Sequence, residues 1–334
     1  MDVIRWTPED SATAAELYAA RRAAHEADEP VEPPKSLPTF RSMLTGDWAG
    51  DQGEVWYVRT GQGELGGYYR LNLPDLENTD RAFAQLFVHP RARRRGLGTE
   101  LVRHAARRAA ANDRAILEGY ALDDSPGEAF ATRLGVSVAL REARRVQDLE
   151  KVSAELVASL RAEAERKAAG YELVTWTGPV PDERAAGLAE VFNAFNDAPR
   201  GEGTDPELWD ANRIRQRTGK LLRETAMRAY SVAAVHVASG EMAAISEVIV
   251  EPEEPEWGHQ GLTAVTRPHR GHRLGMLTKT AMMEWLAQAE PRLRKIETGN
   301  AVENDHMIAV NEGLGYELVT PGWQFYEIPV EKVV

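Results

Sequence analysis

Apolar residues follow the same order of patterns at two places in the chain. The run AFAQLFV at 82–88 is typical of a strand, and TELVRHAARRAAA at 99–111 has its apolar residues at helical spacing. Further along, GLTAV at 261–265 precedes MLTKTAMMEWLAQA at 276–289, again a strand-like run before a helical pattern. The pattern predicts two units, each built from a strand, a loop and a helix.

The loops between these segments are related as well. Val88 opens VHPRARRRGLG, and Val265, 177 residues later, opens VTRPHRGHRLG. Two further pairs keep a similar spacing: RLGV and GLGY are 180 residues apart, and IRW and VTW are 170 apart. Near-constant offsets predict two copies of one fold. The acidic EPEEPE at 251–256 is expected to be a turn between two strands of the second copy.

The boundary between the copies falls in a charged stretch with apolar residues at helical spacing, 153–170. Ser153 is the expected N-cap and Gly170 the expected stop of this helix. The predicted organisation is an N-terminal domain, a linker helix and a C-terminal domain, at 1–150, 151–170 and 171–334.

Charge and cysteine usage exclude several classes of function. The 334 residues carry a net charge of −12, which repels nucleic acid and anionic lipid. The absence of cysteine excludes disulfides, thiolate metal sites and cysteine nucleophiles. His269 and His272 lack a third metal ligand at a fitting spacing, so no metal is expected. No run approaches the ~18 apolar residues of a membrane span, and MDVIRWTPED does not resemble a signal peptide, so a cytoplasmic protein is expected.

Against this acidic background, residues 91–98 read RARRRGLG. Glycine permits close backbone approach, the start of the following helix offers free N–H groups, and arginine adds charge-assisted hydrogen bonds. That combination suits a pyrophosphate, although arginine also outnumbers lysine on ordinary surfaces of this chain. No Gly-Lys-Ser/Thr follows, and the glycine spacing does not fit a dinucleotide fold.

VHPRARRRGLG followed by a helix resembles the acyl-CoA-binding motif of the GNAT N-acyltransferase superfamily, Val-x-x-x-x-Arg/Gln-x-x-Gly-x-Gly/Ala. The resemblance covers essentially the whole chain as two tandem copies, similar to the mycothiol synthase type. It implies an α+β fold, in which each copy is a mixed, mostly antiparallel sheet flanked by helices. It also implies that acetyl-CoA binds a V-shaped gap between two strands and that an amine attacks the thioester directly.

The resemblance assigns cofactor-binding positions in both copies. In the first copy they are Val88, Arg93, Arg94, Arg95, Gly96, Gly98 and Thr99. In the second copy they are Val265, Arg270, Gly271, His272, Leu274, Gly275 and Met276. The second copy departs from the pattern because Arg273 stands at the first Gly position, which puts its fit to the pyrophosphate in doubt.

A second family signature has an Asn that touches the cofactor and, seven residues on, a Tyr that protonates the leaving thiolate. The second copy keeps the first of these as Asn304 and has Asn311 at the Tyr position. The first copy has Asp124 and Ala131 instead. Both copies therefore lack the usual acid.

The attacking amine must also lose a proton, which requires a base. Glu256 and His259, at the matching strand of the second copy, are the candidates; the alternative for each is an ordinary exposed turn or strand-end residue. Asn196 and Asp197 lie in a segment that resembles the roof of the acceptor site. Because it keeps Asn304 and a candidate base, the second copy is favoured for catalysis. The first copy is expected to bind acyl-CoA or to be structural.

The predicted function is transfer of an acetyl group from acetyl-CoA to a primary amine of a small molecule. One alternative is a non-catalytic, regulatory acyl-CoA-binding protein, because both copies lack the Tyr. Another is mycothiol synthase-like acetylation of a cysteinyl sugar conjugate. The two copies are expected to form a monomer that is a pseudo-dimer, or else a homodimer.

Overall fold

The computed structural model describes residues 2–29, 31–45, 52–199 and 203–333. The chain divides into two compact units. The N-terminal unit comprises Met1–Glu142, Arg200–Asp205 and Thr320–Val334, and the C-terminal unit comprises Ala143–Pro199 and Pro206–Val319. Among the described residues, no helix has the length and apolar character needed to cross a membrane.

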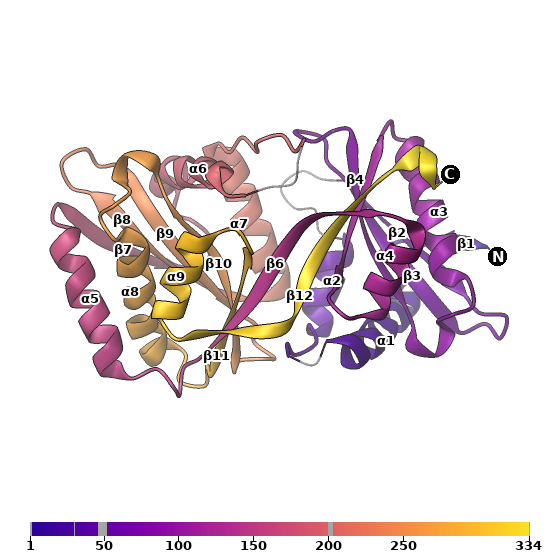
Figure 1. The fold of residues 1–334 in the computed structure, drawn as a ribbon, viewed down its shortest axis with the longest axis horizontal. Coiled ribbons are helices and arrows are strands. Elements are labelled where there is room, and N and C mark those ends of the chain that lie inside the picture. Colours follow the sequence, from indigo (N-terminus) through magenta and orange to yellow (C-terminus); the bar gives the residue numbers. More distant parts are fainter. Residues whose placement is uncertain (1, 30, 46–51, 200–202, 334) are drawn as a thin grey trace. The chain divides into compact units, whose positions relative to one another are not determined.

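The N-terminal unit follows the order predicted by the hydrophobic pattern (Figure 1). Its elements are β1 (Val3–Arg5), α1 (Ser11–Asp28), α2 (Leu37–Thr45), β2 (Gln52–Arg59), β3 (Leu65–Leu73), β4 (Arg81–Val88), α3 (Leu97–Ala110), β5 (Ile116–Leu122), α4 (Pro126–Leu134) and the first part of β6 (Ser137–Asp148).

The C-terminal unit repeats this order after one additional helix. Its elements are α5 (Ala154–Lys167), β7 (Tyr171–Thr177), α6 (Ala185–Ala194), α7 (Ala211–Thr225), β8 (Arg228–His236), β9 (Met242–Val250), β10 (Trp257–Val265), α8 (Leu274–Ala289), β11 (Lys295–Ala301), α9 (Asp305–Gly313) and the first part of β12 (Tyr316–Pro329). The Ser153 side chain accepts a hydrogen bond from Leu156 N, so the predicted N-cap is confirmed. The predicted turn at 251–256 joins β9 to β10.

Each unit contains a mixed sheet in which one neighbouring pair is parallel. In the N-terminal unit β1, β2, β3 and β4 pair antiparallel in that order, and β4 pairs with β5 in parallel. In the C-terminal unit β7, β8, β9 and β10 pair antiparallel, and β10 pairs with β11 in parallel. The predicted mixed, mostly antiparallel sheets flanked by helices are confirmed.

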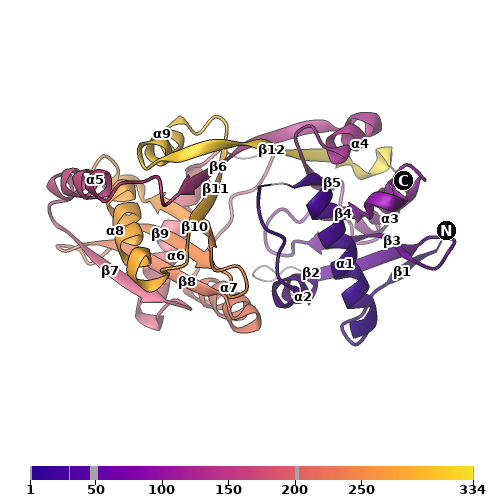
Figure 2. The ribbon, with the colours of Figure 1, turned by 90° about the horizontal axis from the view of Figure 1, so that it is seen from below.

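Helices cover both faces of each sheet (Figure 2). In the N-terminal unit α3 presents Leu97, Leu101 and Ala105, spaced by four residues, to the core formed with β3, β4 and β5. α1 and α2 pack on the opposite face through Leu17 and Phe40. In the C-terminal unit α8 and α5 share one core, and α6 and α7 another.

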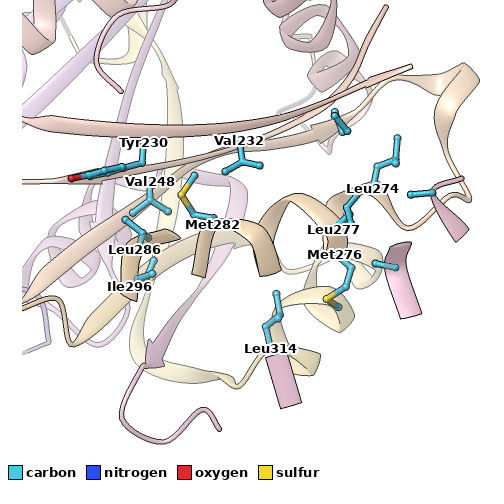
Figure 3. Close-up of a cluster of buried hydrophobic side chains, with 14 of the residues drawn as sticks. Tyr230, Val232, Val248, Leu274, Met276, Leu277, Met282, Leu286, Ile296 and Leu314 are labelled. Carbon is cyan, nitrogen blue, oxygen red and sulfur yellow. The ribbon is translucent and has the colours of Figure 1, made fainter. Parts of the chain in front are cut away.

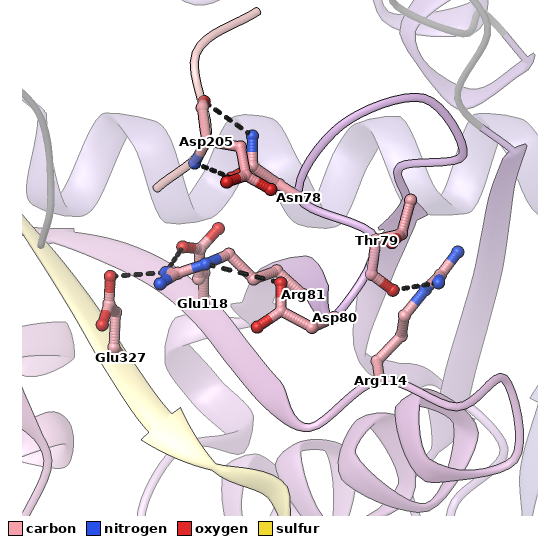
Figure 4. A network of polar contacts seen from close by, with 8 residues as sticks. All are labelled: Asn78, Thr79, Asp80, Arg81, Arg114, Glu118, Asp205 and Glu327. Atoms are coloured by element: carbon pink, nitrogen blue, oxygen red, sulfur yellow. Dashed lines mark hydrogen bonds and ion pairs between the residues drawn. The ribbon is translucent and has the colours of Figure 1, made fainter. Parts of the chain in front are cut away.

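The last strand of the chain belongs to the sheet of the N-terminal unit. The final part of β12 pairs antiparallel with β5, and Glu327 lies opposite Glu118. Arg81 on β4, only 3% exposed, binds both carboxylates, at 2.6 Å to Glu118 and 2.7 Å to Glu327 (Figure 4). This buried cation compensates two acids that would otherwise repel each other across the strand pair.

The last part of β6 has the corresponding place in the C-terminal unit. Arg144, which is fully buried, donates to Glu297 of β11 at 2.7 Å, and Gln147 donates to Leu314 O at 2.7 Å. Each unit is therefore completed by a strand that begins in the other. The predicted boundaries at 150 and 171 differ from the observed units, because strand pairing and not chain order assigns residues 320–334 to the N-terminal unit.

Candidate functional site

The two parallel strand pairs separate after three residues. β4 and β5 are in register from Arg81 opposite Ile116 to Phe83 opposite Glu118, and within these fully described strands the register ends there. β4 continues to pair with β3 as far as Val88. The strands therefore open into a gap, and β10 and β11 separate in the same way after His259.

The loop after β4 leads into a helix that has no side-chain cap. Arg94 and Gly96 adopt left-handed conformations, with φ of 63° and 83°, and α3 begins directly afterwards. The first amide bonded inside the helix is that of Glu100, which donates to Gly96 O at 3.0 Å. The N–H groups of Leu97, Gly98 and Thr99 therefore point out of the positive end of the helix, as an anion site requires.

The corresponding loop of the C-terminal unit keeps the same backbone course. Gly271 and Arg273 are left-handed, with φ of 86° and 55°, and α8 begins at the next residue without a side-chain cap. Glycine has moved from the second left-handed position to the first, and Arg273 takes the strained position that Gly96 occupies in the first copy. The departure from the motif therefore does not change the loop conformation.

The first arginine of each motif is bound to a neighbouring aspartate. Arg93 donates from Nε to Val88 O at 3.2 Å and from both terminal nitrogens to Asp28, at 2.8 and 2.5 Å. Arg270 repeats both contacts, with Val265 O and with Asp197. These arginines tie the strand end to the preceding helix, so less of their charge is available to a phosphate.

A groove of about 610 Å³ opens at the start of α3 in the N-terminal unit. All first-copy candidates except the exposed Arg95 line it. The wall residues are Ala24, Asp28, Leu86, Phe87, Val88, Ala92, Arg93, Arg94, Gly96, Leu97, Gly98, Thr99, Pro126, Gly127, Ala129, Phe130 and Arg133. A Cβ atom at Gly98 would lie 3.5 Å from the ring of Phe130, in ordinary van der Waals contact, so this position faces the wall between α3 and α4 and can accept a side chain.

The second-copy candidates lie at one loop, but several are part of the core. Met276, at the helical position that Thr99 has in α3, is buried with Leu277 and Leu314 (Figure 3). The methyl group of Met276 would lie 3.8 Å from a Cβ atom at Gly313, so the Met276 side chain fills space beside α9. Leu274 and Val265 belong to the same hydrophobic cluster. His272 contacts the end of α5 and the start of β7: its Nδ1 lies 3.2 Å from Lys167 O, and its ring centre lies 5.4 Å from that of Tyr171.

Asn304 and Asn311 serve the local structure of α9. Asn304 caps the helix and accepts from Met307 N at 3.3 Å. Asn311 is fully buried and donates to Asn300 Oδ1 at 2.8 Å. In the first copy Ser125 caps α4, so Ser125, next to Asp124, has the structural position of Asn304.

The candidate bases Glu256 and His259 lie at different distances from the gap. Glu256 is exposed at the start of β10, and its carbonyl accepts from Arg294 N and Lys295 N. At ~3.3 Å per residue, this position is roughly 30 Å along the strand from the loop after Val265. His259 is half-buried at the last parallel pair, where β10 and β11 separate. Only His259 is at the gap.

A second, smaller pocket of about 150 Å³ adjoins the groove in the N-terminal unit, and Phe87 lines both. The wall residues used below are Arg21, His25, Glu29, Tyr68, Phe87 and Tyr120. Burial raises the pKa of Tyr68 and of Tyr120, and burial lowers the pKa of His25. At neutral pH this pocket therefore holds protonated tyrosines and a neutral histidine.

Sequence reasoning missed this pocket. Arg21, His25 and Glu29 recur every four residues along α1 and its end, so they share one face. That spacing was the available signal. The sequence predicts a roof for the acceptor site only in the second copy, at Asn196 and Asp197. There Asn196 bonds the backbone of Glu207, and Asp197 binds Arg267 and Arg270.

Comparison with known proteins identifies the family. A model of the acetyltransferase (GNAT) family matches residues 15–136. A tandem GNAT protein from the clavulanic acid biosynthesis pathway, solved without acetyl-CoA, is 30% identical with a TM-score of 0.81, and the match covers 98% of both chains.

Two curated mycothiol acetyltransferases are also similar. That of Mycolicibacterium smegmatis is 29% identical over 258 residues, covering 74% of this chain and 76% of that protein. That of Mycolicibacterium paratuberculosis is 34% identical over 140 residues, which is 41% of this chain and 40% of that protein. The chain belongs to the GNAT family of N-acetyltransferases and carries two GNAT units in tandem.

Proposed function

We propose that this protein transfers an acetyl group from acetyl-CoA to a primary amine of a small molecule, and that the transfer takes place in the N-terminal unit. One observation carries the proposal. The groove at the uncapped start of α3 and the smaller pocket share one wall residue, Phe87. A donor in the groove and an acceptor in the pocket would meet beside β4, where the sheet has opened.

This assignment differs from the sequence-based preference for the second copy. Two features support the change: the filled space around Met276, and the match of the family model to residues 15–136. His259 remains the candidate base for the C-terminal unit if that copy is also active.

The residues of the small pocket can supply both proton transfers. The Nε2 atom of His25 lies 2.7 Å from the carbonyl oxygen of Glu32, so it carries the proton and leaves Nδ1 as a base. The amine nitrogen attacks the thioester carbon, the C–S bond breaks, and Nδ1 of His25 accepts the amine proton. The Tyr120 hydroxyl, kept protonated by burial, is the candidate donor to the departing thiolate. It would replace the tyrosine missing from the family signature.

Gly98→Asp tests the donor site. A carboxylate in the first turn of α3 favours the helix dipole but repels a pyrophosphate bound at the same amides. The affinity for acetyl-CoA, measured by isothermal titration calorimetry on the full chain, should fall at least about 30-fold, since each lost or repelled charged contact changes binding by ~2 kcal/mol or more. The unfolding midpoint should not decrease.

Gly275→Asp makes the same change at the corresponding position of α8. Acetyl-CoA affinity within twofold of the unmodified chain is expected if the N-terminal unit alone binds the donor. The reverse pattern, loss with Gly275→Asp and none with Gly98→Asp, would return the donor site to the second copy. Tight donor binding without thiol release on a broad amine panel would favour the non-catalytic acyl-CoA-binding alternative.

A further inference from the structure

The cations around the small pocket differ in their partners. Lys35 pairs with Glu32 at 2.5 Å, and Arg22 pairs with Glu26 at 2.7 Å. Arg21 makes no ion pair or side-chain hydrogen bond with a residue that the structure describes. Its guanidinium carbon instead lies 4.4 Å from the centre of the Phe87 ring. Arg21 is therefore a cation whose charge is available to a ligand.

The charge of Arg21 faces the inside of the pocket. Burial raises the pKa of Tyr68 and of Tyr120, and the nearby positive charge of Arg21 opposes both rises. Burial lowers the pKa of His25, and Arg21 adds to that shift. Three groups on α1, β3 and β5 thus lie within electrostatic reach of one guanidinium. Because Phe87 lines both cavities, that guanidinium lies where donor and acceptor meet.

The pocket also contains a negative group. Glu29, directly after α1, is 5% exposed and lines the pocket. The charges of Glu32 and, less strongly, Glu29 act on Tyr120 in the opposite sense to that of Arg21 and add to the rise that burial causes in the pKa of that tyrosine. Charges of both signs therefore face the same small space, as a ligand with an ammonium and a carboxylate would require.

The pocket size restricts the acceptor. At about 150 Å³ the pocket is about a quarter of the size of the neighbouring groove of about 610 Å³. A small cavity of this kind suits a compact acceptor such as an amino acid. The aromatic side chains of Tyr68, Phe87 and Tyr120 enclose it and exclude competing water.

We infer that the acceptor is a small amine that carries a carboxylate, an amino acid or a close analogue, and that Arg21 binds its carboxylate while Glu29 faces its ammonium. Transfer follows the reaction given above: the ammonium releases one proton to solvent, and the free amine attacks the thioester carbon as the C–S bond breaks. His25 accepts the second proton of the amine and Tyr120 protonates the thiolate, so that an N-acetylated acid and coenzyme A leave. This inference rests on the proposed function and adds the substrate class.

The experiment uses the full chain with acetyl-CoA and measures thiol release. The probes are the proteinogenic amino acids, each compared with its carboxamide, and ethylamine as an uncharged-tail amine. At least one amino acid should exceed its own carboxamide by about 50-fold or more in kcat/KM, because a half-buried guanidinium left without an anion disfavours the amide. Arg21→Gln should reduce that preference to within about fivefold, and Arg21→Lys should keep part of it. Arg103→Gln, which removes an exposed charge on α3, should change nothing.

The outcomes separate this inference from the proposed function. Failure of the unmodified chain to bind acetyl-CoA, measured by calorimetry on the same samples, would contradict the proposed function itself. Donor binding with turnover only of amines that lack a carboxylate, or with no amino acid accepted, would overturn the inference and leave the donor site standing. Retention of the full carboxylate preference in Arg21→Gln would also overturn it.

Discussion

Single residues explain why two unequal motifs form one loop. Arg94 and Arg273 each accept a left-handed conformation that costs an ordinary residue ~1–2 kcal/mol, and glycine takes the other left-handed position in each copy. The sequence identified the motif positions, and it identified the loss of glycine at Arg273. It did not indicate that the backbone would tolerate that loss, because tolerance depends on the helix and strand that hold the loop ends.

His25 leads to a pH prediction. Burial lowers its pKa below the usual 6.5, so the base form prevails at neutral pH. With saturating acceptor, kcat should be constant above pH 7 and should fall as the pH decreases below 6.5. His25→Gln should lower kcat roughly 100-fold and remove that acidic limb. An unchanged pH profile of kcat in the variant would exclude His25 as the base.

Lys279 leads to a stability prediction. This lysine of α8 is 3% exposed, its Nζ donates to Gln260 at 2.8 Å, and burial lowers its pKa to about 7. Above pH 7 the folded chain then binds fewer protons than the unfolded chain, whose lysine titrates near 10.5, so the free energy of unfolding should rise between pH 7 and 9. Urea titrations should show that rise in the unmodified chain.

Lys279→Met provides the comparison. Methionine fills a similar volume without a charge, so the variant should lose this part of the pH dependence and be more stable at pH 7. Equal slopes of stability against pH in both proteins would show that Lys279 remains protonated when folded. Val102, at the corresponding position of α3, is the apolar precedent within the same chain.

At the scale of elements, the strands were predictable where the apolar runs were continuous. The segment 82–88 is all of β4 except Arg81, the segment 261–265 is the last part of β10, and each leads through a loop into a helix. The start of α5 could be predicted from Ser153, because an N-cap is a contact between residues close together in the chain. The partner of an edge strand could not, since pairing depends on residues far apart in the chain.

Arg81 holds the last strand in place, and its loss should destabilise the N-terminal unit. Arg81→Met leaves Glu118 and Glu327 facing each other with no cation between them, at a cost of ~3–5 kcal/mol. Urea unfolding of the unit should shift accordingly. Adding Glu327→Gln to Arg81→Met should recover part of the loss, because it removes one of the two uncompensated acids. A change below ~1 kcal/mol for Arg81→Met would contradict this role.

At the scale of the whole molecule, chain order and folded units do not coincide. A fragment of residues 1–150 contains the groove proposed for acetyl-CoA but lacks residues 323–329, which pair with β5. The fragment should show no cooperative unfolding transition, and it should not bind acetyl-CoA. Supplying residues 151–334 as a second chain during refolding should restore binding. A fragment 1–150 that binds acetyl-CoA as well as the full chain would show that β12 is dispensable.

The sequence by itself determined the family, the two copies and the position of the loops proposed to bind phosphate, because these depend on local features: periodicity, glycine positions and helix starts. It also excluded cysteine chemistry. Only the tertiary structure decided which strands complete each unit, and that Met276 fills the space that Thr99 leaves open. It also brought Arg21, Tyr68 and Tyr120 into one pocket. These properties arise from contacts between distant segments, and no local pattern of residues specifies which side chain will occupy a shared space. RARRRGLG predicts acetyl-CoA as the donor, and the folded chain supports a proposal for where an acceptor would meet it.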